Sequence, residues 1–210
     1  MPRILLVIFT ACVITLSPAA GATLLVDATG PDFPQPCIIC GDVSGRTGGW
    51  DFVLSDTITI DGLGFLDVGS PGLGTDVEVG LWNGSGTLLA SAVITDASTA
   101  VPSLAGIPWL IEDISPLDLA PGTYVLGALF FSDLPLSDPL MGAPTIPEVT
   151  RGGGRIGPGP DSGFQYPADD FIFSSTGITA RLVSVPEPGT FALLSLGALA
   201  LGFRHRQDRA

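Results

Sequence analysis

The chain has 210 residues, of which 46% are apolar and 14% are charged, and its formal net charge is -13. All eight basic residues are arginines, so the 21 acidic residues are almost unopposed, which disfavours nucleic acid as a partner. Gly and Pro contribute 28 and 19 residues, too many for a protein of long helices, while the aliphatic content is too high for a disordered chain. These figures leave a turn-rich β protein of one domain, or at most two.

The N-terminus has the pattern of a secretory signal peptide. Arg3 precedes a charge-free run of 13 residues, Ile4 to Leu16, and the small residues Ala20 and Ala22 follow. As a helix the run would be about 20 Å long, shorter than the ~30 Å hydrocarbon layer, which argues against the alternative of a membrane anchor. We predict that the export machinery recognises this segment and that cleavage follows Ala22.

The middle of the chain shows the alternation of apolar and polar residues that is typical of β-strands. Asn83-Gly84-Ser85-Gly86 predicts a hairpin turn, because Asn and Gly accept the positive φ that such turns require. The same residues also fit a glycosylation acceptor pattern, which the turn explains without modification. We predict strands at 50–54, 57–66 with a kink at Asp61-Gly62, 76–82, 87–94, 107–114, 123–131, 171–173 and 178–185.

Seven to nine short antiparallel strands of this kind predict an all-β fold. We expect an antiparallel β-sandwich of jelly-roll or immunoglobulin-like type, flanked by an N-terminal signal helix and a short C-terminal hydrophobic helix. The stretch 134–170 contains seven prolines and the run Arg151-Gly152-Gly153-Gly154-Arg155, and there we predict a long loop. Such a loop is either a ligand surface or a decoration between strands.

The C-terminus carries a second charge-free run, from Thr190 to Phe203. Prolines precede it and the arginines Arg204, Arg206 and Arg209 follow it. The prolines mark the start of a helix, and the arginines are expected on the cytoplasmic side of a membrane, which places the preceding domain outside. As a helix the run would span only about 21 Å, which suits a processed signal better than the alternative of a plain tail anchor.

This segment, Val185 to Arg209, resembles the PEP-CTERM sorting signal of Gram-negative bacteria, because Pro186-Glu187-Pro188 matches its motif. The resemblance implies recognition by a membrane-embedded exosortase, at least transient contact of the C-terminal helix with the membrane, and delivery to the cell envelope or extracellular polysaccharide. Residues 50–131 also resemble a β domain that recurs in PEP-CTERM proteins. We therefore divide the chain into a signal peptide (1–22), a secreted β-sandwich domain (23–185) and a sorting signal (186–210).

The secreted domain has few groups for catalysis. It holds all the acidic residues except Glu187 and Asp208, four arginines, and neither His nor Lys. Ser-His-Asp, Cys-His, Schiff-base and zinc-hydrolase schemes therefore each lack a member. Glu78, Glu112 and Glu148 are candidates for a hydrolase that uses two facing carboxylates, but no spacing ties any two of them together. We expect a protein that is not an enzyme.

Three further features suggest binding or stability. Cys37 and Cys40 are predicted to form a disulfide in an oxidising compartment. A redox site is the alternative, but a redox C-x-x-C normally begins a helix, and the residues after Cys40 do not predict one. Trp82, on the outward face beside the hairpin, is a candidate for stacking on sugars. Asp67, Asp76 and Glu78 bracket one loop and are weak candidates for Ca²⁺, although charged loops also keep a secreted domain soluble.

The leading hypothesis is a structural or adhesive protein that acts in exopolysaccharide. A carbohydrate-binding module, assisted by calcium, is the alternative. No cofactor besides Ca²⁺ is expected.

Overall fold

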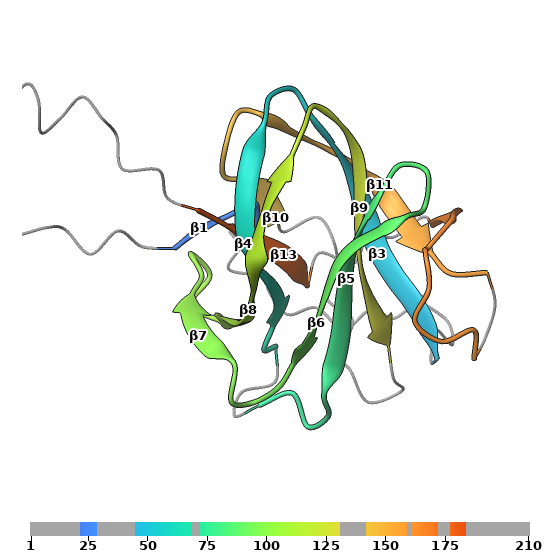
Figure 1. The fold of residues 1–210 in the computed structure, drawn as a ribbon. Coiled ribbons are helices and arrows are strands. Elements are labelled where there is room, and N and C mark those ends of the chain that lie inside the picture. Colours follow the sequence, from blue (N-terminus) through green and yellow to red (C-terminus); the bar gives the residue numbers. More distant parts are fainter. Residues whose placement is uncertain are drawn as a thin grey trace, which may run out of the picture.

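The computed structural model describes residues 22–28, 45–68, 72–130, 142–158, 161–171 and 177–183. Within these ranges the regular secondary structure consists of β-strands and no helix. Two antiparallel sheets pack together, so the predicted β-sandwich is confirmed (Figure 1). The two predicted flanking helices fall outside the described residues.

One sheet has five strands and the other has six. In order across the five-stranded sheet these are β1 (Thr23–Leu24), β13 (Ile178–Leu182), β4 (Ile58–Leu66), β8 (Pro108–Leu119) and β7 (Thr99–Pro102). The six-stranded sheet has the order β12 (Asp169–Phe171), β11 (Val149–Ile156), β3 (Arg46–Leu54), β9 (Gly122–Phe130), β5 (Val77–Asn83) and β6 (Leu88–Ile94). A short separate ladder pairs β2 (Val26–Ala28) with β10 (Gly142–Pro144).

The main core lies between the two sheets and follows from the period-2 alternation of the strands. On β5 the residues Val77, Val79 and Leu81 face inward and are fully buried. Trp50 of β3 is also fully buried, and its indole Nε1 donates a hydrogen bond of 3.1 Å to the carbonyl oxygen of Ile178 in the opposite sheet. The core therefore joins the sheets by one directional contact in addition to apolar packing.

A second, smaller apolar cluster lies around Trp109, which is fully buried on β8. Its indole Nε1 donates a hydrogen bond of 3.0 Å to Oδ1 of Asp27 in β2. The other carboxylate oxygen of Asp27 accepts a hydrogen bond of 3.1 Å from the amide of Leu104, in the loop before β8. The remaining members of the cluster are Leu24, Ala28, Leu66 and Ile111, with Val68, Val101, Ala105 and Ile107 packed against them.

Several predicted local features are confirmed. The hairpin joins β5 to β6, and Oδ1 of Asn83 accepts hydrogen bonds from the amides of Ser85 (3.1 Å) and Thr87 (2.9 Å). The predicted kink at Asp61-Gly62 is an irregularity within one strand, because the pairing of β4 with β8 shifts register between Ile60 and Gly62. A local turn and a local bulge can both be recognised from the residues that form them.

The prediction of a long loop at 134–170 is wrong. This stretch contains β11, which pairs with β3 inside the six-stranded sheet, as well as β10 and the start of β12. The glycine run forms a bulge, because the pairing of β11 with β3 shifts register between Arg151 and Gly154. A Cβ on Gly152 would collide with the carboxylate of Asp51. Glycine in a strand often marks such a close approach rather than an end of the strand.

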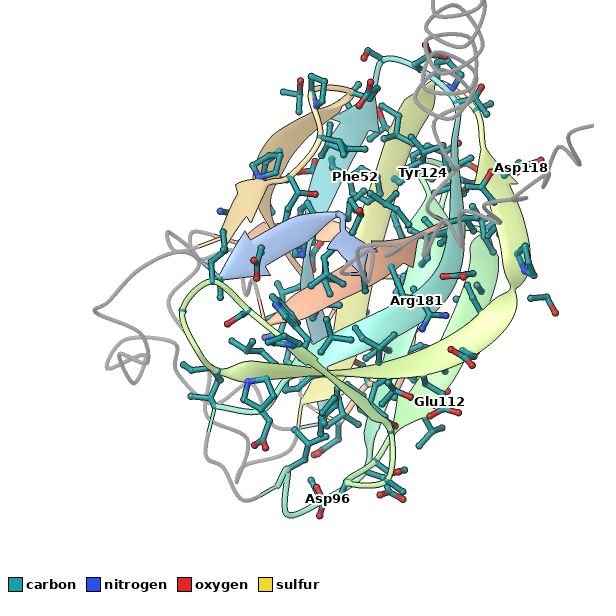
Figure 2. All side chains as sticks on the ribbon, turned by 90° about the vertical axis from the view of Figure 1, so that its left-hand side faces the viewer. Phe52, Asp96, Glu112, Asp118, Tyr124 and Arg181 are labelled. Atoms are coloured by element: carbon teal, nitrogen blue, oxygen red, sulfur yellow. The ribbon has the colours of Figure 1, made fainter. Side chains whose placement is uncertain are left out.

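A tyrosine fixes the chain where it passes from one sheet to the other between β8 and β9. The hydroxyl of Tyr124 donates a hydrogen bond of 2.7 Å to the carbonyl oxygen of Ala120, four residues earlier. The Tyr124 ring stacks on Phe52 with centroids 5.6 Å apart, and both side chains are labelled in Figure 2. This geometry is that of the tyrosine corner found in other β-sandwiches.

The first and last strands are neighbours. Thr23 of β1 lies opposite Leu182 of β13, and the two strands lie side by side in Figure 1. β1 thus begins one residue after Ala22, an exposed residue at the predicted cleavage site. The assignment of a single secreted domain to 23–185 stays a prediction.

Candidate functional site

Trp82 lies on the outer face of β5, but the prediction that it is accessible is wrong. Only 3% of its surface is exposed. The ring of Phe164 lies 5.2 Å from the Trp82 ring, and that of Tyr166 lies 6.4 Å away, measured between centroids. Both rings belong to residues 161–167, a segment after β11 that we call the strap. Trp82 is buried because the strap returns over the outer face of the six-stranded sheet.

Glycines in two adjacent strands, β5 and β9, make room for this aromatic cluster of Trp82, Phe164 and Tyr166. Gly80 pairs with Gly127. A Cβ on Gly80 would lie 2.6 Å from Cη2 of Trp82 and 2.6 Å from Cζ of Phe164. A Cβ on Gly127 would lie 3.1 Å from Cζ3 of Trp82. The rings therefore occupy space that ordinary side chains would fill.

The start of the strap is fastened to β3 by hydrogen bonds. Thr47 is fully buried, and its Oγ1 donates to the carbonyl of Gly163 (3.0 Å) and accepts from the amide of Gln165 (3.0 Å). The amide of Gly163 donates to the carbonyl of Gly45 at 2.9 Å. Since these contacts flank Phe164 on both sides, they fix where its ring meets Trp82.

The strap leaves part of the aromatic cluster in contact with solvent, because Phe164 and Tyr166 are only half-buried. Arg155 lies on the same face of the sheet, because it pairs with Gly49, which pairs with Gly127 under the cluster. Nη2 of Arg155 bonds to Oδ2 of Asp51 at 2.6 Å, and Nη1 bonds to Oδ1 of Asp170 at 2.5 Å. The hydrogen bond that Arg155 donates to Asp51 raises the pKa of Arg155, against the opposing effect of burial, so the guanidinium is a fixed positive charge.

This arrangement is the candidate ligand surface of the described chain. It offers two partly exposed aromatic rings beside a fixed cation and the exposed carboxylate of Asp170. Aromatic faces bind apolar faces of ligands, and charged groups at their edge bind hydroxyls and fix orientation. Phe164 and Tyr166 were missed in the sequence, although their spacing of two residues puts both rings on one side of an extended chain.

The five-stranded sheet carries a second charged group on its outer face. Nε of Arg181 bonds to Oδ1 of Asp61 at 2.7 Å, and Nη2 bonds to Oδ1 of Asp113 at 2.7 Å. The hydrogen bond that Arg181 donates to Asp61 raises the pKa of Arg181, while burial acts in the opposite direction. Figure 2 looks onto this face, with Arg181 near its middle. The arginine ties three neighbouring strands, β4, β8 and β13, and no aromatic ring is recorded beside it among the residues described.

The three candidate catalytic glutamates are separated in the fold. Glu78 lies on β5, and Glu148 lies in the turn before β11, three strands away in the same sheet. At ~4.8 Å per strand this separates them by roughly 14 Å, more than the spacing that glycosidases use. Glu112 belongs to the other sheet, and its Oε2 accepts a hydrogen bond of 2.9 Å from Oγ of Ser98. These three carboxylates do not face one another.

The calcium candidates are likewise not brought together. Within the described ranges no group of three or more His, Cys, Asp or Glu side chains is placed to hold a metal ion. Asp67 is buried at the end of β4, and Asp76 is exposed before β5. Glu78 is half-buried on β5.

Several predicted residues lie outside the described ranges, so the structure does not place them. They are Ala20 of the cleavage site, Cys37 and Cys40, the sorting triplet Pro186, Glu187 and Pro188, and the basic tail Arg204, Arg206 and Arg209. Within the part of the chain that is described, no helix is long and apolar enough to cross a membrane.

Residues 184–207 match the family model of the PEP-CTERM protein-sorting motif. The chain carries a PEP-CTERM sorting signal. This signal identifies an exported protein that an exosortase sorts toward the cell envelope. Neither a curated protein nor a solved structure matches the chain.

Proposed function

We propose that this PEP-CTERM protein is a structural or adhesive component of the exopolysaccharide around the cell and is not an enzyme. The observation that carries the proposal is the sorting signal at 184–207 behind a β-sandwich, because the signal sends the sandwich to the cell envelope. The separation of Glu78, Glu112 and Glu148 supports a role other than hydrolysis. The acidic surface keeps such a domain hydrated and soluble.

A second candidate function is carbohydrate binding at the aromatic cluster. The half-buried rings of Phe164 and Tyr166, with Arg155 and Asp170 on the same face of the sheet, favour it. A sugar ring has apolar C–H faces that pack on aromatic rings and hydroxyls that bond to charged groups at the rim. The described residues offer no calcium cluster near this surface, so we propose direct contact of sugar with protein.

One experiment tests both functions. The gene is deleted, and the strain is supplied with the natural protein, Tyr166→Ala or the matched control Tyr166→Phe. We measure cell-to-cell adhesion and the amount of protein retained by isolated exopolysaccharide, with calcium present and after chelation. We expect the deletion to lower adhesion and the natural protein to restore it. If adhesion does not depend on the gene, the structural or adhesive role is wrong.

The retention measurement decides the second function. Sugar binding at the aromatic cluster predicts that Tyr166→Ala lowers affinity for the polysaccharide about tenfold, which is ~1.4 kcal/mol. Tyr166→Phe keeps the ring and should bind like the natural protein. Equal binding by all three proteins would exclude the aromatic cluster as a sugar site and leave the structural role standing.

A further inference from the structure

The edge strands of the two sheets differ in how well they are protected from pairing with another chain. β1 has two residues, β7 has four and ends in Pro102, and β12 has three, of which Asp169 and Asp170 are charged. Short length, proline and charge are the usual protections of a sheet edge. β6 has seven residues, Leu88-Leu89-Ala90-Ser91-Ala92-Val93-Ile94, without proline or charge, and its pairing with β5 is irregular only where it skips Leu89.

β6 also exposes apolar side chains. It pairs with β5 on one side, and no strand of the described chain pairs with its other side. Leu88 is 45% exposed, Leu89 36% and Val93 50%. These are three of the five large apolar side chains that are exposed in the described ranges. The strand therefore combines unpaired backbone groups with an apolar outer face.

We propose that β6 is the interface through which two copies of this chain pair, antiparallel, about a two-fold axis at Ser91. The two six-stranded sheets then form one continuous sheet across the pair. This inference does not depend on the proposed function, because it rests only on the edge strand. Strand addition at a sheet edge is a common mode of association, in which backbone hydrogen bonds supply the affinity.

The sequence of β6 suits pairing with itself. A two-fold interface requires that the same patch be complementary to itself. With Ser91 opposite Ser91, Leu89 of each copy lies opposite Val93 of the other. Directly opposed residues of antiparallel strands share one face of the sheet, so the exposed Leu89 and Val93 would cover each other. The small Ala90 and Ala92 face the core side and leave the partner backbone free to approach.

Charge does not oppose a second copy at this edge. Both copies are strongly acidic and repel each other over most of their surfaces, but β6 brings no charge to the contact. The nearest strand with a charge is β5, where Glu78 pairs with Val93. In the paired state the two β5 strands are separated by roughly 14 Å, beyond the ~8 Å Debye length at physiological salt. A basic peptide, by contrast, would find no carboxylate on β6 with which to pair.

The test uses the exported protein purified from producing cells and sedimentation velocity over a range of concentrations. We expect a reversible dimer for the natural protein. Ser91→Asp and Ser91→Lys each place two like charges directly opposite each other on the axis, and each should weaken the dimer at least tenfold. A mixture of Ser91→Asp with Ser91→Lys places opposite charges there and should restore the dimer. Only a two-fold contact at Ser91 predicts that restoration.

Matched valines supply the control. Val53 is 46% exposed and lies on β3 inside the same sheet, whereas Val93 is 50% exposed and lies on the edge. Val93→Asp should weaken the dimer and Val53→Asp should not, while both proteins should keep the β-sheet circular dichroism of the natural chain. A natural protein that stays monomeric, or a dimer that these substitutions leave unchanged, would overturn the proposal and assign the edge to another occupant or to none.

Discussion

The outer faces of the two sheets each bury a tryptophan, but they do so by different means. Trp109 is enclosed on the five-stranded sheet by aliphatic side chains and is held by a hydrogen bond to Asp27. Trp82 lies over glycines of the six-stranded sheet and is covered by Phe164 and Tyr166, which stay half-buried. The first face is a closed extension of the core. The second face buries its tryptophan and still presents aromatic surface to solvent, which is why it is the candidate site.

The largest expected change in stability comes from replacing the two tryptophans. We expect Trp109→Ala to lower the free energy of unfolding by about 3–5 kcal/mol, because it empties a closed site and removes the partner of Asp27. Trp82→Ala should cost less, because the strap rings can move into the space. Urea unfolding of the exported protein measures both values. An equal loss in the two variants would mean that the strap is as rigid as the closed face.

A smaller effect is expected from the arginines on the two faces. Arg155→Met removes the partner of Asp51, whose side chain is 14% exposed, while Arg181→Met removes the partner of Asp61, whose side chain is 30% exposed. Because the more buried carboxylate loses more when unpaired, we expect a cost of about 1–2 kcal/mol for Arg155→Met and under ~1 kcal/mol for Arg181→Met. Thermal unfolding checks the order of the two, and the reverse order would contradict it.

A comparable global effect, with a local readout, is expected where the strap is fastened. Thr47→Val keeps the shape of the side chain and removes the hydroxyl that bonds to Gly163 and Gln165. We expect a loss of about 1 kcal/mol and faster hydrogen exchange at the amide of Gln165. The amide of Leu104, which bonds to Asp27 on the other face, serves as the control and should exchange at its natural rate. Acceleration at both amides would indicate a general loss of stability rather than a loosened strap.

Features that depend on a few neighbouring residues could be predicted from the sequence. The hairpin at Asn83 and the bulge at Gly62 follow from local backbone preferences, and the sorting signal follows from a short ordered pattern that the family model also matches. β11 was missed because its glycines resemble a loop, whereas Gly152 lies in a bulge where a Cβ would collide with the carboxylate of Asp51.

The cover over Trp82 could not be predicted for a related reason. Alternation correctly puts Trp82 on the outer face of β5, but it carries no information about which distant segment lies over that face. Phe164 is more than eighty residues away in the sequence, and its contact depends on Thr47 in a third segment. Burial on the outer face of a sheet is decided by such long-range contacts.

The pairing of β1 with β13 sets the time at which the domain can be completed. Thr23 and Leu182 are separated by about 160 residues, so their contact closes the longest loop in the described fold, and contacts of this kind form late. Leu182 is also two residues before the segment that matches the sorting signal. The five-stranded sheet therefore acquires its last strands only when the chain is available as far as Leu182, and until then β4 lacks its neighbour β13. A chain that ends before β13 would have an open sheet, so the segment just before the sorting signal completes the fold.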